Sequence, residues 1–98
     1  MPHMRYTRSA ESDLLELWLT IAEDNPVAAD NVLDIIRDAV KALAAQPEMG
    51  KARSELYGGL RSFPTRTPYI IFYLAENEGV QVIRVLHHAR NIDAEYFD

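Results

Sequence analysis

The chain has 98 residues, of which 48% are hydrophobic and none is cysteine. This length is that of one domain with a modest core, and the composition is that of an ordinary soluble globular protein. The absence of cysteine excludes disulfides, thiol catalysis and a cysteine-based zinc site, and it fits a reducing cytoplasm.

The net charge of −5 is unevenly distributed along the chain. Residues 1–48 carry four Lys or Arg against nine Asp or Glu, whereas residues 49–98 carry six of each. Non-specific binding to nucleic acid needs a positive field, which this chain lacks overall. Local recognition stays open because eight of the ten cationic residues are arginine, whose planar guanidinium suits specific carboxylate or phosphate contacts. We expect no membrane span, since no apolar run is long enough, and no secretory signal in the first residues.

The N-terminal half predicts a short strand and two helices. Residues 3–6 form the strand, and Ser9 is a candidate N-cap for a helix that ends near residues 23–24. A second helix begins at Asn25 and Pro26, because Asn caps well and proline suits the first helical position. Apolar side chains recur at helical spacing in both segments, which predicts an antiparallel hairpin with one apolar face on each helix. These positions are Leu14, Leu17, Trp18 and Ile21, then Val32, Ile36, Ala39, Val40 and Leu43.

The C-terminal half predicts strands. A polar connection over residues 51–59 leads into them, and a hairpin turn at residues 76–79 joins the last two. In that turn Asn77 or Gly79 is expected to take a positive φ. Strands are expected over residues 60–63, 67–75 and 80–87. The predicted fold is therefore α+β in the order β-α-α-β-β-β: an antiparallel twisted sheet with the helical hairpin packed on one face, in a single domain over residues 1–98.

The last two strands are nearly continuous in apolar residues, from Ile70 to Leu74 and from Val82 to Leu86. An antiparallel sheet with one face in water should alternate between apolar and polar residues. Because two helices can cover only one face, we expect a partner chain, the C-terminal tail or a second subunit to cover the other. The pattern favours a protein that works by interaction.

Several segments together resemble the ParE branch of the RelE/ParE toxin superfamily. They are LRSFP at residues 60–64, YIIFY at 69–73 and RVLHHAR at 84–90, with PEMG at 47–50 and the stretch from Tyr6 to Trp18. The resemblance implies a small bacterial toxin of a type II toxin–antitoxin pair, without a cofactor or metal. It also implies a ParD-like antitoxin that wraps the toxin in a hetero-oligomeric complex and supplies any DNA contact.

The superfamily contains two activities: ribosome-dependent mRNA cleavage, as in RelE-like members, and inhibition of DNA gyrase, as in ParE-like members. Aligned by eye, Arg90 falls on a catalytic arginine of the nucleases and Tyr96 on their catalytic tyrosine, with His87 as a further candidate. The first catalytic arginine is replaced by Ile70, and losing such a phosphate contact costs orders of magnitude in rate. The resemblance therefore favours a gyrase inhibitor. A ribosome-dependent endoribonuclease and a non-toxic module that binds an antitoxin and regulates its own operon are the alternatives.

Two sets of site residues follow from this interpretation. The target-facing surface is expected to include Arg84, His87, Arg90 and Asn91, with a purely structural ion pair as the alternative for Arg84. His87 and His88 should face opposite sides of the sheet, so a joint metal site is not expected. The antitoxin-binding residues are expected to be Leu14, Trp18, Ile21, Ile70, Phe72 and Leu74.

Overall fold

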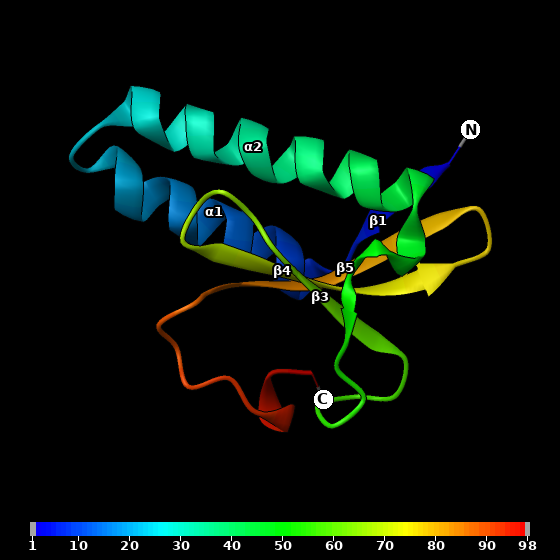
Figure 1. Ribbon diagram of the computed structural model, residues 1–98. Coiled ribbons are helices and arrows are strands. Elements are labelled where there is room, and N and C mark those ends of the chain that lie inside the picture. Colours follow the sequence, from blue (N-terminus) through cyan, green and yellow to red (C-terminus); the bar gives the residue numbers. More distant parts are fainter. Residues whose placement is uncertain (1, 98) are drawn as a thin grey trace.

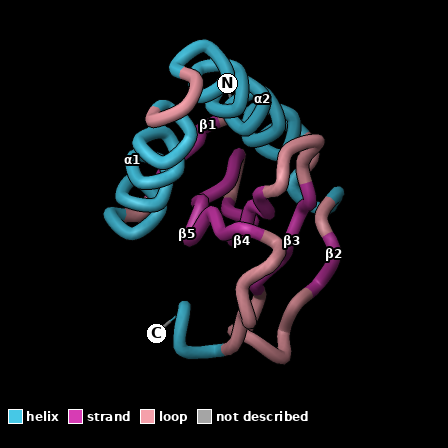
Figure 2. Tube along the Cα trace, turned by 90° about the vertical axis from the view of Figure 1, so that its left-hand side faces the viewer, coloured by secondary structure: helices cyan, strands magenta, loops and turns pink. Residues whose placement is uncertain are grey.

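The computed structural model of the chain describes residues 2–97. Two helices lie together on one face of a five-stranded sheet, and the C-terminal segment lies against the other face (Figures 1 and 2). The elements are β1 (His3–Tyr6), α1 (Arg8–Ala22), α2 (Pro26–Ala45), β2 (Lys51–Ala52), β3 (Leu60–Pro64), β4 (Tyr69–Glu76) and β5 (Gly79–His87), with short helical turns at Pro47–Met49 and Ala94–Phe97. Neither helix is long and apolar enough to cross a bilayer.

The α+β fold and the order of its predicted elements are confirmed, with one strand added and one strand reversed. The added strand is β2, which lies in the connection expected to be a loop and pairs antiparallel with β3. The sheet order is β1-β5-β4-β3-β2, and β1 runs parallel to β5, so the sheet is mixed instead of antiparallel throughout. Local patterns could not give this direction, because β1 and β5 come from opposite ends of the chain.

Helix α1 begins two residues earlier than expected, and its N-cap is Thr7 instead of Ser9. The Thr7 hydroxyl oxygen accepts a hydrogen bond from the Ala10 N–H (3.0 Å). The same hydroxyl donates to the Ile83 carbonyl oxygen of β5 (2.7 Å). Thr7 therefore caps the helix and anchors it to the sheet, a double role that residue preference alone does not reveal.

Helix α2 begins as predicted. The Asn25 side chain accepts from the Ala28 N–H (3.0 Å), and Pro26 occupies the first helical position. Both preferences are local, since an Asx cap needs only the next three residues and proline lacks an N–H that would be unpaired there anyway.

The hairpin turn between β4 and β5 differs from the expectation at one position. Glu78 takes the positive φ (64°), not Asn77 or Gly79. Gly79 has another role: a Cβ atom there would collide with the backbone oxygen and ring of His3 in β1. The glycine therefore lets the edge strand approach closely.

The main core lies between the helical hairpin and the sheet. Leu17 of α1 and three fully buried residues of α2 pack against side chains of β4 and β5. The fully buried residues of this core are Ala10, Ile36, Val40, Leu43, Ile71, Tyr73, Val80 and Val82. This arrangement confirms the predicted packing of the hairpin on one face of the sheet.

A second, smaller apolar cluster covers the other face of the sheet. Leu60, Phe72 and Leu86 pack there under Phe97, whose ring centre is 5.1 Å from that of Phe72. Among the three covers considered from the sequence, the C-terminal tail is the one present. The apolar character of both strands is therefore satisfied within the chain and does not by itself require a partner.

Candidate functional site

A bulge in β5 sets the direction of the side chains at its C-terminal end. Tyr73 is opposite Val82 whereas Phe72 is opposite Arg84, so Ile83 is an additional residue in β5. Such an insertion reverses which face the following side chains point to. As a result Val82 and Val85 both contribute to the core under the helices, and Leu86 points to the tail side.

Arg84 and Asp13 form an ion pair between β5 and α1. The Arg84 Nε donates to Asp13 Oδ2 (2.7 Å) and its Nη2 to Oδ1 (2.8 Å), and the Val85 N–H also donates to Oδ2 (3.0 Å). Asp13 is only 8% exposed. The hydrogen bonds that Arg84 donates to this carboxylate raise the pKa of Arg84. The structural pairing that was the alternative for Arg84 is thus present, and its role toward a target stays a prediction.

The C-terminal tail brings Tyr96 to both arginines. Arg84 Nη1 donates to the Tyr96 carbonyl oxygen (3.2 Å), and the guanidinium lies 5.4 Å from the centre of the Tyr96 ring. The Tyr96 phenol beside Arg90 is the largest cause of a raised pKa of Arg90. Arg90 and Tyr96, two of the three candidates under the nuclease alternative, are therefore neighbours, and Arg90 itself is exposed.

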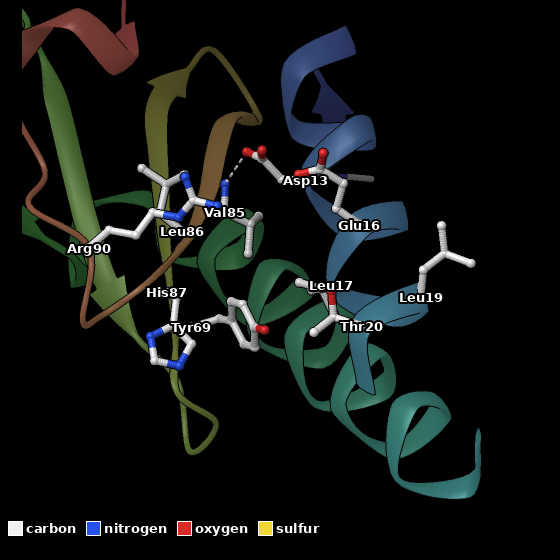
Figure 3. A pocket seen from close by; sticks show the side chains of 10 residues that line it. All are labelled: Asp13, Glu16, Leu17, Leu19, Thr20, Tyr69, Val85, Leu86, His87 and Arg90. Carbon is white, nitrogen blue, oxygen red and sulfur yellow. Dashed lines mark hydrogen bonds between the residues drawn. The ribbon is translucent and has the colours of Figure 1, made fainter. Parts of the chain in front are cut away.

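An open cleft of about 560 Å³ lies between α1 and the C-terminal half of β5. Figure 3 shows the β5 side chains facing those of α1 across it, with the Val85–Asp13 hydrogen bond at one end. Arg90 and His87 come from the strand side, and Glu16 from the helix side. The lining residues are Asp13, Glu16, Leu17, Leu19, Thr20, Tyr69, Val85, Leu86, His87 and Arg90. We call this the β5-edge cleft.

The two histidines do not point to opposite sides of the sheet. Their rings stack with centres 4.8 Å apart at 24°, because β5 ends at His87 and the alternation of a strand does not continue to His88. His87 Nδ1 accepts from the Ala89 N–H (3.0 Å), and its ring meets that of Tyr69 edge-on. Within residues 2–97 no group of three or more His, Asp or Glu side chains is placed to hold a metal ion.

A second surface feature is a groove along the helical hairpin, with a volume of about 380 Å³. Leu14 and Trp18 of the expected antitoxin-binding set line it, together with Leu15, Leu33, Glu11 and Arg37. The Trp18 Nε1 donates to Asp30 of α2 (2.9 Å), which joins the two helices. A further hollow that also includes Met4, Tyr6 and Lys41 shares Glu11, Leu14 and Arg37 with it. Two leucines of α1 that were not expected from the sequence to bind an antitoxin are also exposed: Leu15 at 60% and Leu19 at 52%.

The other residues expected to bind an antitoxin have mixed environments. Ile70 and Leu74 are half-buried in the tail-side cluster, and they share a face with Phe72 as predicted from strand parity. Ile21 packs half-buried against the main core. Phe72 is fully buried beneath the tail in the chain by itself, and its contact with an antitoxin stays a prediction.

The fold and these surfaces define a small α+β protein with a helical hairpin on one face of a mixed sheet and open hollows beside α1. The model of the family described as "ParE toxin of type II toxin-antitoxin system, parDE" matches residues 4–92. The chain therefore belongs to the ParE toxin family, which confirms the resemblance seen in the sequence.

The chain is similar in sequence to named toxins and shares its fold with a solved structure. The chain is 32% identical over 90 residues to "Toxin ParE3" of Caulobacter vibrioides, covering 91% of this chain and 89% of the relative. It is 29% identical to "Toxin RelE2" of the same organism, covering 92% and 99%. A chain of a "Chromosomal ParDE TA system from P. aeruginosa" has the same fold, with a TM-score of 0.73 at 22% identity over 89% of this chain and 96% of that chain.

Proposed function

We propose that this ParE-family toxin inhibits DNA gyrase when it is free and thereby blocks replication. The observation that carries the proposal is the environment of Ile70, which aligns with a catalytic arginine of the nucleases. Ile70 lies opposite Leu86 in the sheet and packs in the apolar cluster under the tail. Phosphate transfer needs cations at the reacting group, and this position supplies none. A binding toxin needs only a contact surface, for which Arg90, His87 and Asn91 are the proposed residues, with Arg84 supporting them.

The second part of the proposal is a ParD-like antitoxin that neutralises the toxin in a hetero-oligomeric complex in the cytoplasm. Leu14 and Trp18 line the hairpin groove, and the exposed Leu15 beside them adds apolar surface. An amphipathic antitoxin helix fits such a groove, because its apolar face would replace water over these side chains. Ile21, Ile70 and Leu74 are secondary contact candidates, and DNA binding is assigned to the antitoxin.

A supercoiling assay with purified gyrase tests the first part. The toxin, added at increasing concentration, is expected to stop supercoiling of relaxed plasmid, and equimolar antitoxin is expected to restore it. Normal supercoiling at every toxin concentration would contradict the proposal.

A ribosome-dependent endoribonuclease is the second candidate function. Two observations favour it: Arg90 and Tyr96 are neighbours, and a protein named RelE2 is among the relatives. A reconstituted translation reaction tests this candidate. If the toxin cleaves translated mRNA and leaves gyrase unaffected, endoribonuclease activity replaces gyrase inhibition as the function.

A non-toxic module that binds an antitoxin and adjusts its DNA binding is the third candidate. Expression of this chain without its antitoxin separates it from the other two. Growth arrest excludes a non-toxic module, whereas unchanged growth with a folded, abundant protein supports it.

A further inference from the structure

We propose that the outer edge of β1 binds a second copy of this chain, with the two β1 strands antiparallel about a two-fold symmetry axis at Arg5. The two sheets then continue into one another. This inference concerns the free toxin and goes beyond the proposed function, because the pairing involves neither gyrase nor an antitoxin.

Strand β1 is an edge of the sheet, paired on one side with β5. The Thr7 N–H donates to the Val82 carbonyl oxygen of β5 (3.0 Å), so the odd-numbered residues of this segment direct their backbone groups at β5. Because these groups alternate in direction along a strand, Met4 and Tyr6 direct theirs outward. Within residues 2–97, these two N–H groups and two carbonyl oxygens have no hydrogen-bond partner. An edge with such unpaired groups is a template for strand addition.

The opposite edge of the sheet is protected against such pairing. Strand β2 has only two residues, one of which is Lys51, and β3 ends at Pro64, which has no N–H to donate. Short strands, lysine and proline are the means by which natural sheets block an edge. Strand β1 has the sequence HMRY, without lysine or proline. It is therefore the edge at which another strand can be added.

One antiparallel register satisfies all the outward groups of two copies. With Arg5 of one copy opposite Arg5 of the other, Met4 of each copy is opposite Tyr6 of the other, and each such pair exchanges two hydrogen bonds. A shift in one direction puts Tyr6 opposite Pro2, which has no N–H. A shift in the other direction puts Met4 opposite Arg8, which already belongs to α1. Since the two-fold pairing leaves no outward group free, assembly ends at a dimer.

The side chains match in the same register. Met4 and Tyr6 share the face of β1 that lies under α2 (Figure 1). Tyr6 packs half-buried against the main core, whereas Met4 is 43% exposed. The register places the Met4 thioether of each copy opposite the Tyr6 ring of the other, which is a favourable sulfur–aromatic contact between strands. Pairing therefore covers an apolar side chain that the single chain leaves in water.

The charges around the β1 edge are balanced, which favours a second copy over a strongly acidic or basic partner. The hollow of about 640 Å³ beside β1 has two carboxylates and two cations in its lining, so an identical surface meets both signs there. These residues are Glu11, Asp38, Arg37 and Lys41. On the other face of β1, Arg5 donates to Glu76 (2.6 Å). Each of two facing Arg5 side chains therefore has its own carboxylate, which offsets their repulsion.

Sedimentation equilibrium of the purified free toxin tests the pairing. The average mass is expected to rise from that of one chain to that of two between ~1 μM and ~1 mM, a range that suits a small interface. Met4→Lys is expected to weaken dimerisation at least about tenfold, because it adds a cation beside Arg37 and Lys41 on the edge. Met49→Lys changes a methionine of the same 43% exposure in the turn after α2 and should alter dimerisation by less than a factor of about two. A monomer at every concentration, or equal effects of the two variants, would overturn the proposal.

A cysteine at the symmetry axis tests the register. Residues opposite each other in a non-hydrogen-bonded antiparallel pair have Cα atoms about 4.5 Å apart, which is within the range that a disulfide bridges. The chain has no cysteine of its own. Under mild oxidation, Arg5→Cys is expected to form a covalent dimer at least about tenfold faster than Arg66→Cys, which places the thiol in the exposed β3–β4 loop. Equal rates would contradict the register. Neither measurement uses gyrase or an antitoxin, so failure of the pairing is distinct from failure of the proposed function.

Discussion

At the scale of single residues, Arg84 and Arg90 occupy very different environments although they are close in sequence. Arg84 is held by Asp13 and by the Tyr96 carbonyl oxygen, whereas the Arg90 side chain is exposed at the rim of the β5-edge cleft. An exposed arginine can be used for recognition without cost to the fold. Arg90 is therefore the residue on which the account of the target surface depends most.

Arg90→Ala is expected to abolish or strongly reduce toxicity while changing the free energy of unfolding by less than about 0.5 kcal/mol, as is usual for surface changes. Growth assays of the free toxin and urea denaturation of the purified variant measure the two effects. Arg66→Ala, which removes an exposed arginine from the β3–β4 loop, is the control and should stay toxic. If Arg90→Ala loses stability along with toxicity, the role of Arg90 is structural.

Asp13→Ala, in contrast, is expected to lower the stability of the fold. It leaves Arg84 partly buried without its carboxylate and removes the partner of the Val85 N–H, which is expected to cost about 3 kcal/mol of stability. Glu16→Ala, one turn further along α1 and exposed, should change stability by less than about 0.5 kcal/mol. Chemical denaturation of both variants checks this, and similar losses for both would contradict the role given to Asp13.

At the scale of elements, the start of α1 gives a direct comparison of two hydroxyl residues. Thr7→Ala removes the cap and the hydrogen bond to Ile83, so it should lower stability by about 1–2 kcal/mol. Ser9→Ala lies inside the first turn, where alanine is a good helix former, and should be neutral within about 0.5 kcal/mol. The midpoint temperatures of thermal unfolding of the two variants show which hydroxyl caps the helix. A larger loss of stability for Ser9→Ala would instead support Ser9 as the N-cap of α1, as expected from the sequence.

The edge strand β1 is held by a cluster that depends on pH. Glu76 accepts hydrogen bonds from Arg5 (2.6 and 3.1 Å) and pairs with His3 (2.9 Å), reaching across Gly79, which has no side chain to block it. Arg5 first and His3 second lower the pKa of Glu76. A lowered folded-state pKa means that this contribution is present above the unfolded pKa of about 4.3 and is lost as the pH falls through the folded value.

Glu76→Gln should therefore be less stable than the wild type at pH 7, and the difference should shrink as the pH falls below about 4. Urea denaturation of both proteins across this range is the measurement. Parallel stability curves over the whole range would show that the Glu76 carboxylate does not stabilise β1.

Local signals predicted some elements well, and long-range contacts explain the differences. The start of α2 follows from Asn25 and Pro26 alone, and the hairpin and apolar strands follow from periodicity. The cap of α1 depends on Ile83, and the Arg84 site depends on Asp13 at the other end of the chain. Both contacts join residues more than 70 positions apart, so no short stretch of sequence predicts them. Leu15 and Leu19 could have been found, because α1 carries more leucines than a single buried stripe needs.

At the scale of the whole molecule, both faces of the sheet are covered by the chain itself, one by the helices and the other by the tail with Phe97 (Figure 2). The hairpin groove and the β5-edge cleft are open surfaces, and both lie beside α1. This arrangement suits a protein that works through contacts: one partner can occupy both hollows and cover the end of β5, where the proposed target surface lies.

The central claim is that this surface acts on gyrase and that the chain cleaves no RNA. Purified toxin, incubated with gyrase and relaxed plasmid, is expected to inhibit supercoiling in a concentration-dependent way, with Arg90→Ala much weaker and Arg66→Ala unchanged. The same preparation should leave translated mRNA intact. Undisturbed supercoiling together with cleavage of mRNA on the ribosome would contradict the account and assign Arg90 and Tyr96 to catalysis.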